Sequence, residues 1–186
     1  MFIASQKRKT NIAEYLLYMW QVEDIIRAND LDIAKIRGTI VDPYPGLDAP
    51  QRKQLEEWYE SFIDMMRREE VVSCGHLQIN NNTLEMLREL HTALLGDDRF
   101  TDYSRAYYEA LPIIVELRAR QGDTKHDEIE TCFDALYGIL LMRLQHKTIS
   151  AATSEAMSKV TRLIALLASY FHRNEVEDIF RHDNEL

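Results

Sequence analysis

The chain has 186 residues, of which only 6 are Gly and 4 are Pro, with 46% hydrophobic residues and a net charge of −9. All-β folds use Gly and Pro in frequent turns, so this composition excludes sandwiches, barrels and propellers while leaving enough apolar residues for a core. The negative charge disfavours nucleic acid and anionic membranes as partners, and no apolar stretch approaches the roughly 20 residues of a membrane span.

The cysteines and the N-terminus indicate a cytoplasmic protein. Cys74 and Cys132 lie far apart and form no CxxC motif or Cys/His cluster, so neither a disulfide framework nor a zinc site is expected. The basic run Lys7-Arg8-Lys9 follows the apolar N-terminal residues, which is the reverse of a signal peptide. We therefore expect a reduced, cytoplasmic location without a membrane segment.

Apolar residues recur with helical spacing over almost the entire chain, and the breaks between the segments carry helix caps. This pattern predicts an all-α fold, a single-domain helical bundle of about seven helices over residues 1–186. Residues 173–186 combine high charge with a weak apolar stripe. This tail is expected to be either flexible or a docking segment.

The first two predicted helices precede the only Pro/Gly cluster of the chain. The first spans 11–28, is capped by Thr10 or Asn11, and is apolar on nearly all sides, which indicates a central position. The second spans 31–37 and is expected to end at Gly38.

The third helix follows the Pro/Gly-rich loop at 41–47. Asp48 and Gln51 have capping-box spacing at its start, and the helix is expected to continue to Cys74. Its predicted buried stripe is Leu55, Trp58, Phe62, Met65 and Val72.

The fourth helix is expected to begin with Asn82 as its cap and to end at Gly96. Its predicted stripe is Leu84, Leu87, Leu90 and Leu94. After a polar connection, 97–102, the fifth helix is expected to end at Gln121.

The sixth helix is predicted to start at an Asp123 cap and to run to about His146. Its predicted buried residues are Ile129, Phe133, Leu136, Leu140 and Leu144. The seventh helix is expected to begin after Thr148 or Ser150. Its predicted buried residues are Met157, Val160, Ile164, Leu167 and Phe171.

Pro112 and Gly138 lie inside predicted helices, where each residue type lowers helix stability. A kink at Pro112 and a close helix crossing at Gly138 are the expected reasons for their presence. Any pocket is expected near these two residues.

Motifs that carry catalysis or bind cofactors are missing from the sequence. No Glu-x-x-His or HExxH motif is present for a metal, the glycines are too isolated to cradle a phosphate, and there is no GxSxG or Ser-x-x-Lys motif for a nucleophile. We therefore predict no catalytic residue, no metal ligand and no cofactor.

Two groups of polar residues share faces with apolar ones. Glu14, Tyr18 and Gln21 lie on one face of the first predicted helix, and a buried carboxylate there is a candidate site. The favoured interpretation is that Glu14 caps the helix or forms an ion pair. His91 lies on the leucine face of the fourth helix, where a satisfied histidine at the core edge is favoured over a ligand.

Two further histidines lie in or near connections. His76 follows Gly75 in a polar segment, and this is the loop most worth inspecting because loops often carry function. The favoured interpretation is nevertheless a helix end followed by an Asn-rich helix start. His126 and Glu130 have the spacing of two ligands on one helix face, but a solvated first turn is favoured.

The N-terminal helix, turn and short helix have the outline of a helix-turn-helix DNA-binding protein. Residues 1–40 hold six basic and five acidic residues, a net charge of only +1, whereas a DNA-reading module presents a basic face.

Three segments of the chain resemble a bacterial family that is catalogued only as a domain of unknown function. They are 7–24 (KRKTNIAEYLLYMWQVED), 75–80 (GHLQIN) and 130–138 (ETCFDALYG). The resemblance covers essentially the whole chain. It implies a stand-alone helical domain without an assigned activity or assigned functional residues.

We expect a cytoplasmic, non-enzymatic helical binding or interaction protein that forms a homodimer through an apolar helix face. A metal-dependent phosphohydrolase using Glu56, Glu57 and Glu60 is one alternative, because these carboxylates lie within two helical turns. A helix-turn-helix regulator is the other. No small-molecule ligand is indicated by the sequence.

Overall fold

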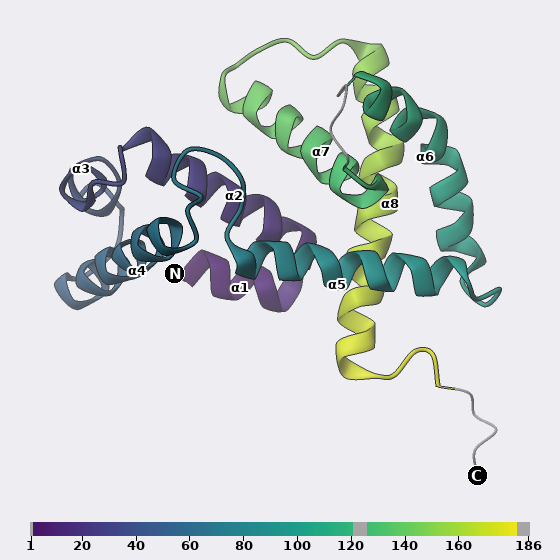
Figure 1. Ribbon diagram of the computed structural model, residues 1–186, viewed down its shortest axis with the longest axis horizontal. Helices are drawn as coiled ribbons and strands as arrows, with labels where there is room; N and C mark the ends of the chain where they lie inside the picture. The colour runs from purple at the N-terminus through teal and green to yellow at the C-terminus, as the bar shows by residue number, and fades with distance from the viewer. Residues whose placement is uncertain (1, 121–125, 182–186) are drawn as a thin grey trace. The chain divides into compact units, whose positions relative to one another are not determined.

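The computed structural model describes residues 2–120 and 126–181, and within them the fold is all-α, as predicted (Figure 1). The described part contains eight α-helices and no strand: α1 Phe2–Thr10, α2 Ile12–Ala28, α3 Ile33–Ile36, α4 Ala49–Arg68, α5 Gln78–Leu95, α6 Thr101–Arg120, α7 Glu128–Leu144 and α8 Ala151–Val176. A π-helical turn, η1 at Arg37–Val41, continues α3. None of the described helices is both long and apolar enough to span a membrane.

The chain divides into two compact units. Unit 1 comprises Met1–Thr10 and Glu14–Thr83, and unit 2 comprises Asn11–Ala13 and Leu84–Leu186. The single domain over 1–186 stays a prediction.

Helix α1 of unit 1 is an element that the apolar periodicity did not predict. It accounts for the eighth helix where about seven were expected. Its last turn carries Lys7, Arg8 and Lys9, and positive charge interacts favourably with the C-terminal end of the helix dipole. Lys7 also forms an ion pair with Glu14 at 2.5 Å. Ala4 is the buried residue of α1, so charge interactions stabilise this helix more than apolar burial does.

The expected stop at Gly38 is wrong, because the chain continues helically through Gly38 as η1 to Val41. A glycine ends a helix when it adopts a positive φ, and Gly38 does not.

The Asp48 capping box of α4 is confirmed: the Gln51 N–H donates to Asp48 at 2.8 Å, and the Gln51 side chain accepts from the Asp48 N–H at 3.0 Å. The end expected at Cys74 is wrong, because α4 stops at Arg68. There Glu70 takes a left-handed φ of 59°, and the Val71 N–H bonds back to the Met66 carbonyl. The turn uses a non-glycine residue and so has no marker in the sequence.

The buried face of α4 differs in part from the predicted stripe. Leu55 and Phe62 are buried as expected, but Val72 is exposed beyond the helix, and Trp58 and Met65 are only partly covered. The buried positions are instead Tyr59, Ile63 and Met66. Each of these residues follows a predicted position by one, so the covered face is rotated around the helix.

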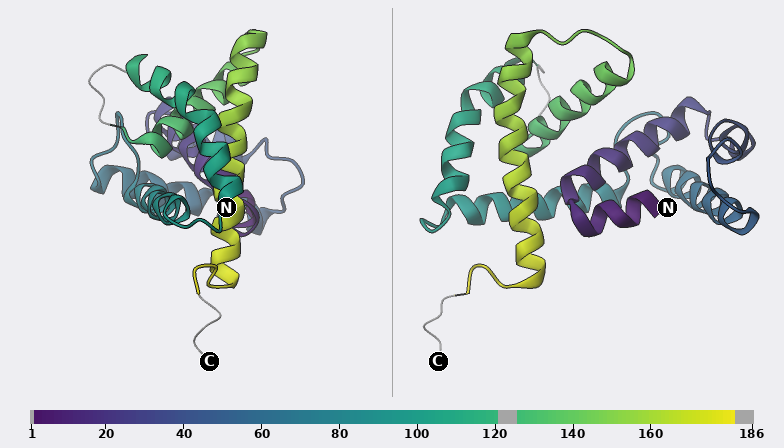
Figure 2. Two further views of the ribbon diagram at one scale, coloured as in Figure 1. Left: turned by 90° about the vertical axis from the view of Figure 1, so that its right-hand side faces the viewer. Right: turned by 180° about the vertical axis from the view of Figure 1, so that it is seen from behind.

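In unit 2, α8 packs along α6 and also contacts α7 (Figures 1 and 2). The Ser150 cap of α8 is confirmed by the Thr153 N–H, which donates to its side chain at 3.0 Å. The predicted stripes of α5 and α8 are also buried: Leu84, Leu87, Leu90 and Leu94 on α5, and Met157, Val160, Ile164, Leu167 and Phe171 on α8. Helix α6 continues through Pro112, and its kink stays a prediction.

The segment predicted to be either flexible or docked, 173–186, begins inside α8. The helix extends to Val176, and Phe180 then packs edge-on against Phe100 with the ring centroids 5.3 Å apart. Arg99 donates to the Phe180 carbonyl at 3.3 Å. The described part of 173–186 therefore includes a docked segment.

The first half of α7 is buried, but its second half is not. The Asp123 cap lies outside the described residues, and Asp127 caps the helix as described. The predicted burial of Leu136, Leu140 and Leu144 is wrong, because the described parts of the chain leave all three at least partly accessible. Periodicity identifies an apolar face, but it cannot tell whether the same chain covers that face.

A close helix crossing at Gly138 is also wrong, since an added Cβ would meet nothing within 4 Å. Replacing Gly138 by Ala is therefore expected to raise the free energy of unfolding by about 1 kcal/mol, the difference in helix propensity. Urea unfolding followed by circular dichroism measures the change. Gly46→Ala is the control and is expected to be destabilising, because Gly46 has a φ of 76°. A loss of stability in Gly138→Ala would contradict the open environment.

Candidate functional site

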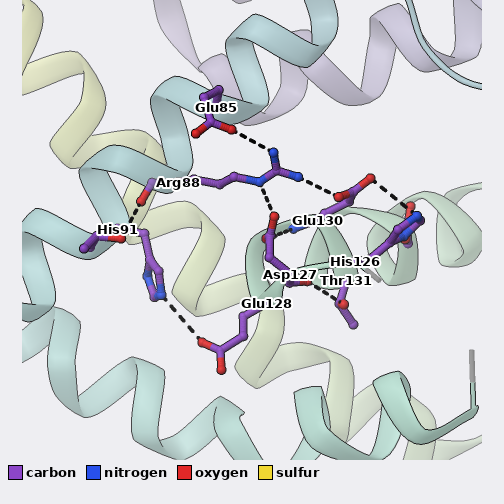
Figure 3. A network of polar contacts seen from close by, with 10 residues as sticks. Glu85, Arg88, His91, His126, Asp127, Glu128, Glu130 and Thr131 are labelled. Carbon is purple, nitrogen blue, oxygen red and sulfur yellow. Dashed lines mark hydrogen bonds and ion pairs between the residues drawn. The ribbon is translucent and has the colours of Figure 1, made fainter. Parts of the chain in front are cut away.

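A network of charged side chains in unit 2 joins α5 to the start of α7 (Figure 3). Its centre is Arg88 on α5, which donates to Glu85 at 2.8 Å and to Glu130 at 2.6 Å. Arg88 also forms a close ion pair with Asp127. One guanidinium thus binds three carboxylates, two of which lie at the start of α7.

Asp127 is positioned by its role as the N-cap of α7. Its side chain accepts from the Glu130 N–H at 2.9 Å, and its carbonyl accepts from the Thr131 hydroxyl at 2.6 Å. An N-cap carboxylate satisfies a backbone donor that has no partner within the helix. The same carboxylate therefore starts the helix and binds Arg88.

His126 extends this network. Its Nδ1 lies 2.7 Å from Asp134, and its Nε2 lies 3.5 Å from Glu130 (Figure 3). The structure thus brings His126 and Glu130 together as their spacing suggested, but Glu130 also binds Arg88. Within the described residues, no three His, Cys, Asp or Glu side chains are placed to hold a metal ion.

A second group of hydrogen-bonded side chains begins at His91, the core-edge histidine of α5. His91 is only 8% exposed, and its Nδ1 lies 2.6 Å from the hydroxyl of Tyr103 on α6. Its Nε2 lies 3.7 Å from Glu128 Oε2, which accepts from the Tyr107 hydroxyl at 2.7 Å. The interpretation of His91 as a satisfied core histidine therefore holds for only one of its two ring nitrogens.

Burial controls the protonation of the side chains in and beside this group. Desolvation lowers the pKa of His91 despite the opposing charge of Glu128. Desolvation raises the pKa of Tyr103 well above its usual range, and that of Tyr107 to about 12 with help from its bond to Glu128. Burial likewise raises the pKa of the Cys132 thiol to about 12. His91 is thus kept neutral near pH 7, while both tyrosines stay protonated.

A pocket of about 320 Å³ lies beside His91 and Glu128. Its polar lining includes His91, Asp127 and Glu128, and its apolar lining includes Leu95 and Ile129. The pocket thus lies between α5 and the first turn of α7. The pocket expected near Pro112 and Gly138 is represented only in part: a separate pocket of about 250 Å³ includes residues of α6 just after Pro112 and does not include Gly138.

Unit 1 contains a buried carboxylate that the sequence did not single out. Glu23 on α2 is 0% exposed and accepts three hydrogen bonds: from the Leu77 N–H at 2.9 Å, from Asn80 Nδ2 at 2.6 Å and from His76 Nδ1 at 2.6 Å. The His76 ring also stacks on Trp20, with the centroids 4.2 Å apart. The loop that carries His76 is therefore held by hydrogen bonds to a buried carboxylate.

Glu23 could have been found from its position along α2. It is spaced at +7 and +4 from Leu16 and Met19 and at −3 from Ile26, and these three apolar residues are fully or almost fully buried. A carboxylate in the register of a buried face signals a paired internal charge. By contrast, Glu14 is exposed and pairs with Lys7, as its favoured interpretation stated.

Two of the three carboxylates proposed for phosphohydrolysis are paired with cations. Glu56 accepts from Arg37 Nε at 2.8 Å, and Glu57 lies 3.7 Å from Lys53 in an exposed i,i+4 pair. Glu60 lines an open groove, and the pKa of Arg37 is raised by its bond to Glu56 and also by the charge of Glu60.

A family model described as Domain of unknown function (DUF4924) matches residues 1–178. The chain belongs to this family. The resemblance inferred from three sequence segments is thereby confirmed. No curated protein and no solved structure matches the chain. The arrangement of side chains in this DUF4924 member is therefore the basis for a proposal about its function.

Titration of His91 predicts how stability depends on pH. Its pKa in the folded chain lies below the ordinary 6.5, so the unfolded chain binds a proton first as the pH falls. The free energy of unfolding is therefore expected to decrease as the pH falls from neutral through 6.5. Urea unfolding at several pH values measures this slope.

The control for this prediction compares two histidine variants. His91→Gln is expected to flatten the slope in that window, whereas His172→Gln, at an exposed position on α8, is expected to leave it unchanged. Equal slopes in wild type and His91→Gln would contradict the prediction.

Proposed function

We propose that the chain is a cytoplasmic, non-enzymatic interaction protein that forms a homodimer through the second half of α7. The supporting observation is the stretch 135–144 (ALYGILLMRL), in which eight of ten residues are hydrophobic and none is buried by the described part of the chain. Leu144 is 53% exposed. The other apolar residues of the stretch are partly covered, and accessible apolar side chains that gather in one segment are typical of an interaction site.

A second copy of the chain is the proposed partner because the surface is almost uncharged. Arg143 is the only charged residue in 135–144, so the face offers little complementarity to a strongly charged partner. A symmetric dimer covers the same apolar patch on both copies at once. Each Å² of apolar surface removed from water contributes about 25 cal/mol.

Neither alternative gains support. Two of the three carboxylates proposed for phosphohydrolysis are paired with cations, Glu56 with Arg37 and Glu57 with Lys53. A DNA-reading helix would follow the turn after α2, but α3 has four residues before the π-helical turn. A cytoplasmic location is supported by two free cysteines, of which Cys74 is exposed.

Light scattering after size-exclusion chromatography tests the dimer. The full chain is expected to show twice its 21.8 kDa mass at high micromolar concentration. Leu144→Lys places a charge on the apolar face at the last residue of α7 and is expected to give a monomer.

Val176→Lys is the matched control, because Val176 is 73% exposed and is the last residue of α8. This variant is expected to stay dimeric. A monomeric wild-type chain, or a dimeric Leu144→Lys variant, would contradict the proposal.

A further inference from the structure

The pocket between α5 and α7 is lined by His91, and the proton on its ring follows from its bond to Tyr103. The Tyr103 side chain is completely buried, and within the described residues its hydroxyl has only one hydrogen-bond partner, His91 Nδ1. A buried hydroxyl donates its proton to the acceptor available to it. Nδ1 therefore accepts from Tyr103, and the neutral ring carries its proton on Nε2.

This Nε2–H faces Glu128 at a distance that allows only a weak interaction. The distance from Nε2 to Glu128 Oε2 is 3.7 Å, longer than a hydrogen bond, and that oxygen already accepts from Tyr107. Among the described residues, no other group accepts from the Nε2–H. The pocket therefore holds a donor and an acceptor that one inserted polar group can connect.

The charges around the pocket restrict which group fits. Arg88 is bound to three carboxylates, so it has little capacity to bind an anionic ligand. His91 presents an N–H donor, which repels an ammonium group at the same position. A hydroxyl or a primary amide satisfies both sides, because each can accept from Nε2–H and donate to Glu128.

Leu95 and Ile129 provide the apolar part of the lining. We propose that this pocket binds a small apolar molecule with one hydroxyl or primary carboxamide group, which bridges His91 Nε2 and Glu128. The pocket volume of about 320 Å³ lies at the small end of the range for ligand sites. The proposal is independent of self-association through α7.

Nuclear magnetic resonance of the full chain, labelled at histidine and isoleucine, tests the proposal with defined probes. Benzyl alcohol and benzamide are expected to shift the His91 Nε2 and Ile129 methyl signals saturably. Toluene, benzylamine and benzoate are matched in size but lack the bridging group or carry a charge. They are expected to bind at least about tenfold more weakly or not at all, because toluene loses both hydrogen bonds of the bridge and the other two carry a charge.

Two tryptophan variants on α5 locate the binding. Leu95→Trp fills the pocket at a partly exposed position and is expected to abolish the shifts. Ala93→Trp lies two residues away on the same helix, outside this pocket, and is expected to preserve them.

Glu128→Ala tests the bridge itself. It removes the acceptor and is expected to make benzyl alcohol bind no better than toluene. The proposal is overturned if no probe shifts His91 saturably, if toluene binds as tightly as benzyl alcohol to the wild type, or if binding survives Leu95→Trp.

Discussion

Replacing Glu23 by Ala is expected to lower the free energy of unfolding by about 3–5 kcal/mol, the range for breaking a buried charged network. The carboxylate is fully buried and accepts from His76, Leu77 and Asn80. Its removal leaves two buried donors, the Leu77 N–H and the Asn80 amide, without their acceptor. Urea unfolding measures the loss.

Glu23→Gln is the matched control, because it keeps the shape of the side chain and replaces the carboxylate by an amide. The Gln oxygen still accepts from Leu77 or Asn80, so the expected loss is smaller, about 1–2 kcal/mol. Amide hydrogen exchange at Leu77 adds a local readout, because its N–H is bonded to Glu23 in the wild type. It is expected to exchange faster in Glu23→Ala. A stability loss below about 1 kcal/mol in Glu23→Ala would contradict the role of this carboxylate.

Replacing Arg88 by Ala is expected to lower the free energy of unfolding by about 2 kcal/mol, less than a fully buried network because the side chain is 30% exposed. The substitution leaves Glu85, Asp127 and Glu130 without their shared cation. High salt is expected to reduce the difference between variant and wild type, because it screens the exposed parts of the network.

Arg120→Ala is the surface control for Arg88. Arg120 pairs with Glu116 on the same helix, and both side chains are largely exposed. The expected loss is about 0.5 kcal/mol or less. Equal losses in Arg88→Ala and Arg120→Ala would show that the three-carboxylate network contributes no more than a surface ion pair. Arg88→Lys keeps the charge but not the fork of donors, so it is expected to fall between wild type and Arg88→Ala.

The predicted helix boundaries succeeded where the cap is local. Asp48 and Ser150 cap helices through backbone groups three residues away. Asp48 was predicted from the sequence, and Ser150 was one of two predicted caps. The start of α5 was not predicted correctly, and the expected Asn82 cap is wrong. The helix begins at Gln78, whose N–H donates to Glu69, while the preceding Leu77 N–H donates to Glu23.

The candidate sites likewise divide into residues that local sequence identified and partners that it did not. His76 and His91 were singled out because histidines in a connection or on an apolar face are unusual. Their partners Glu23, Tyr103 and Glu128 could not be assigned, because they lie on other helices, 12 to 53 residues away in the chain. Spacing identifies residues that share a helix, and packing decides which helices meet.

The sequence by itself determined the helical class of the protein, because helical periodicity and caps depend on residues within one or two turns of each other. It also identified Leu136, Leu140 and Leu144 as an apolar face of α7. Only the tertiary structure decided that this face is not fully buried by the described chain, while Glu23 is buried inside unit 1. Local spacing can mark the face on which a residue lies, but burial depends on contacts between distant segments, and local spacing does not specify those contacts.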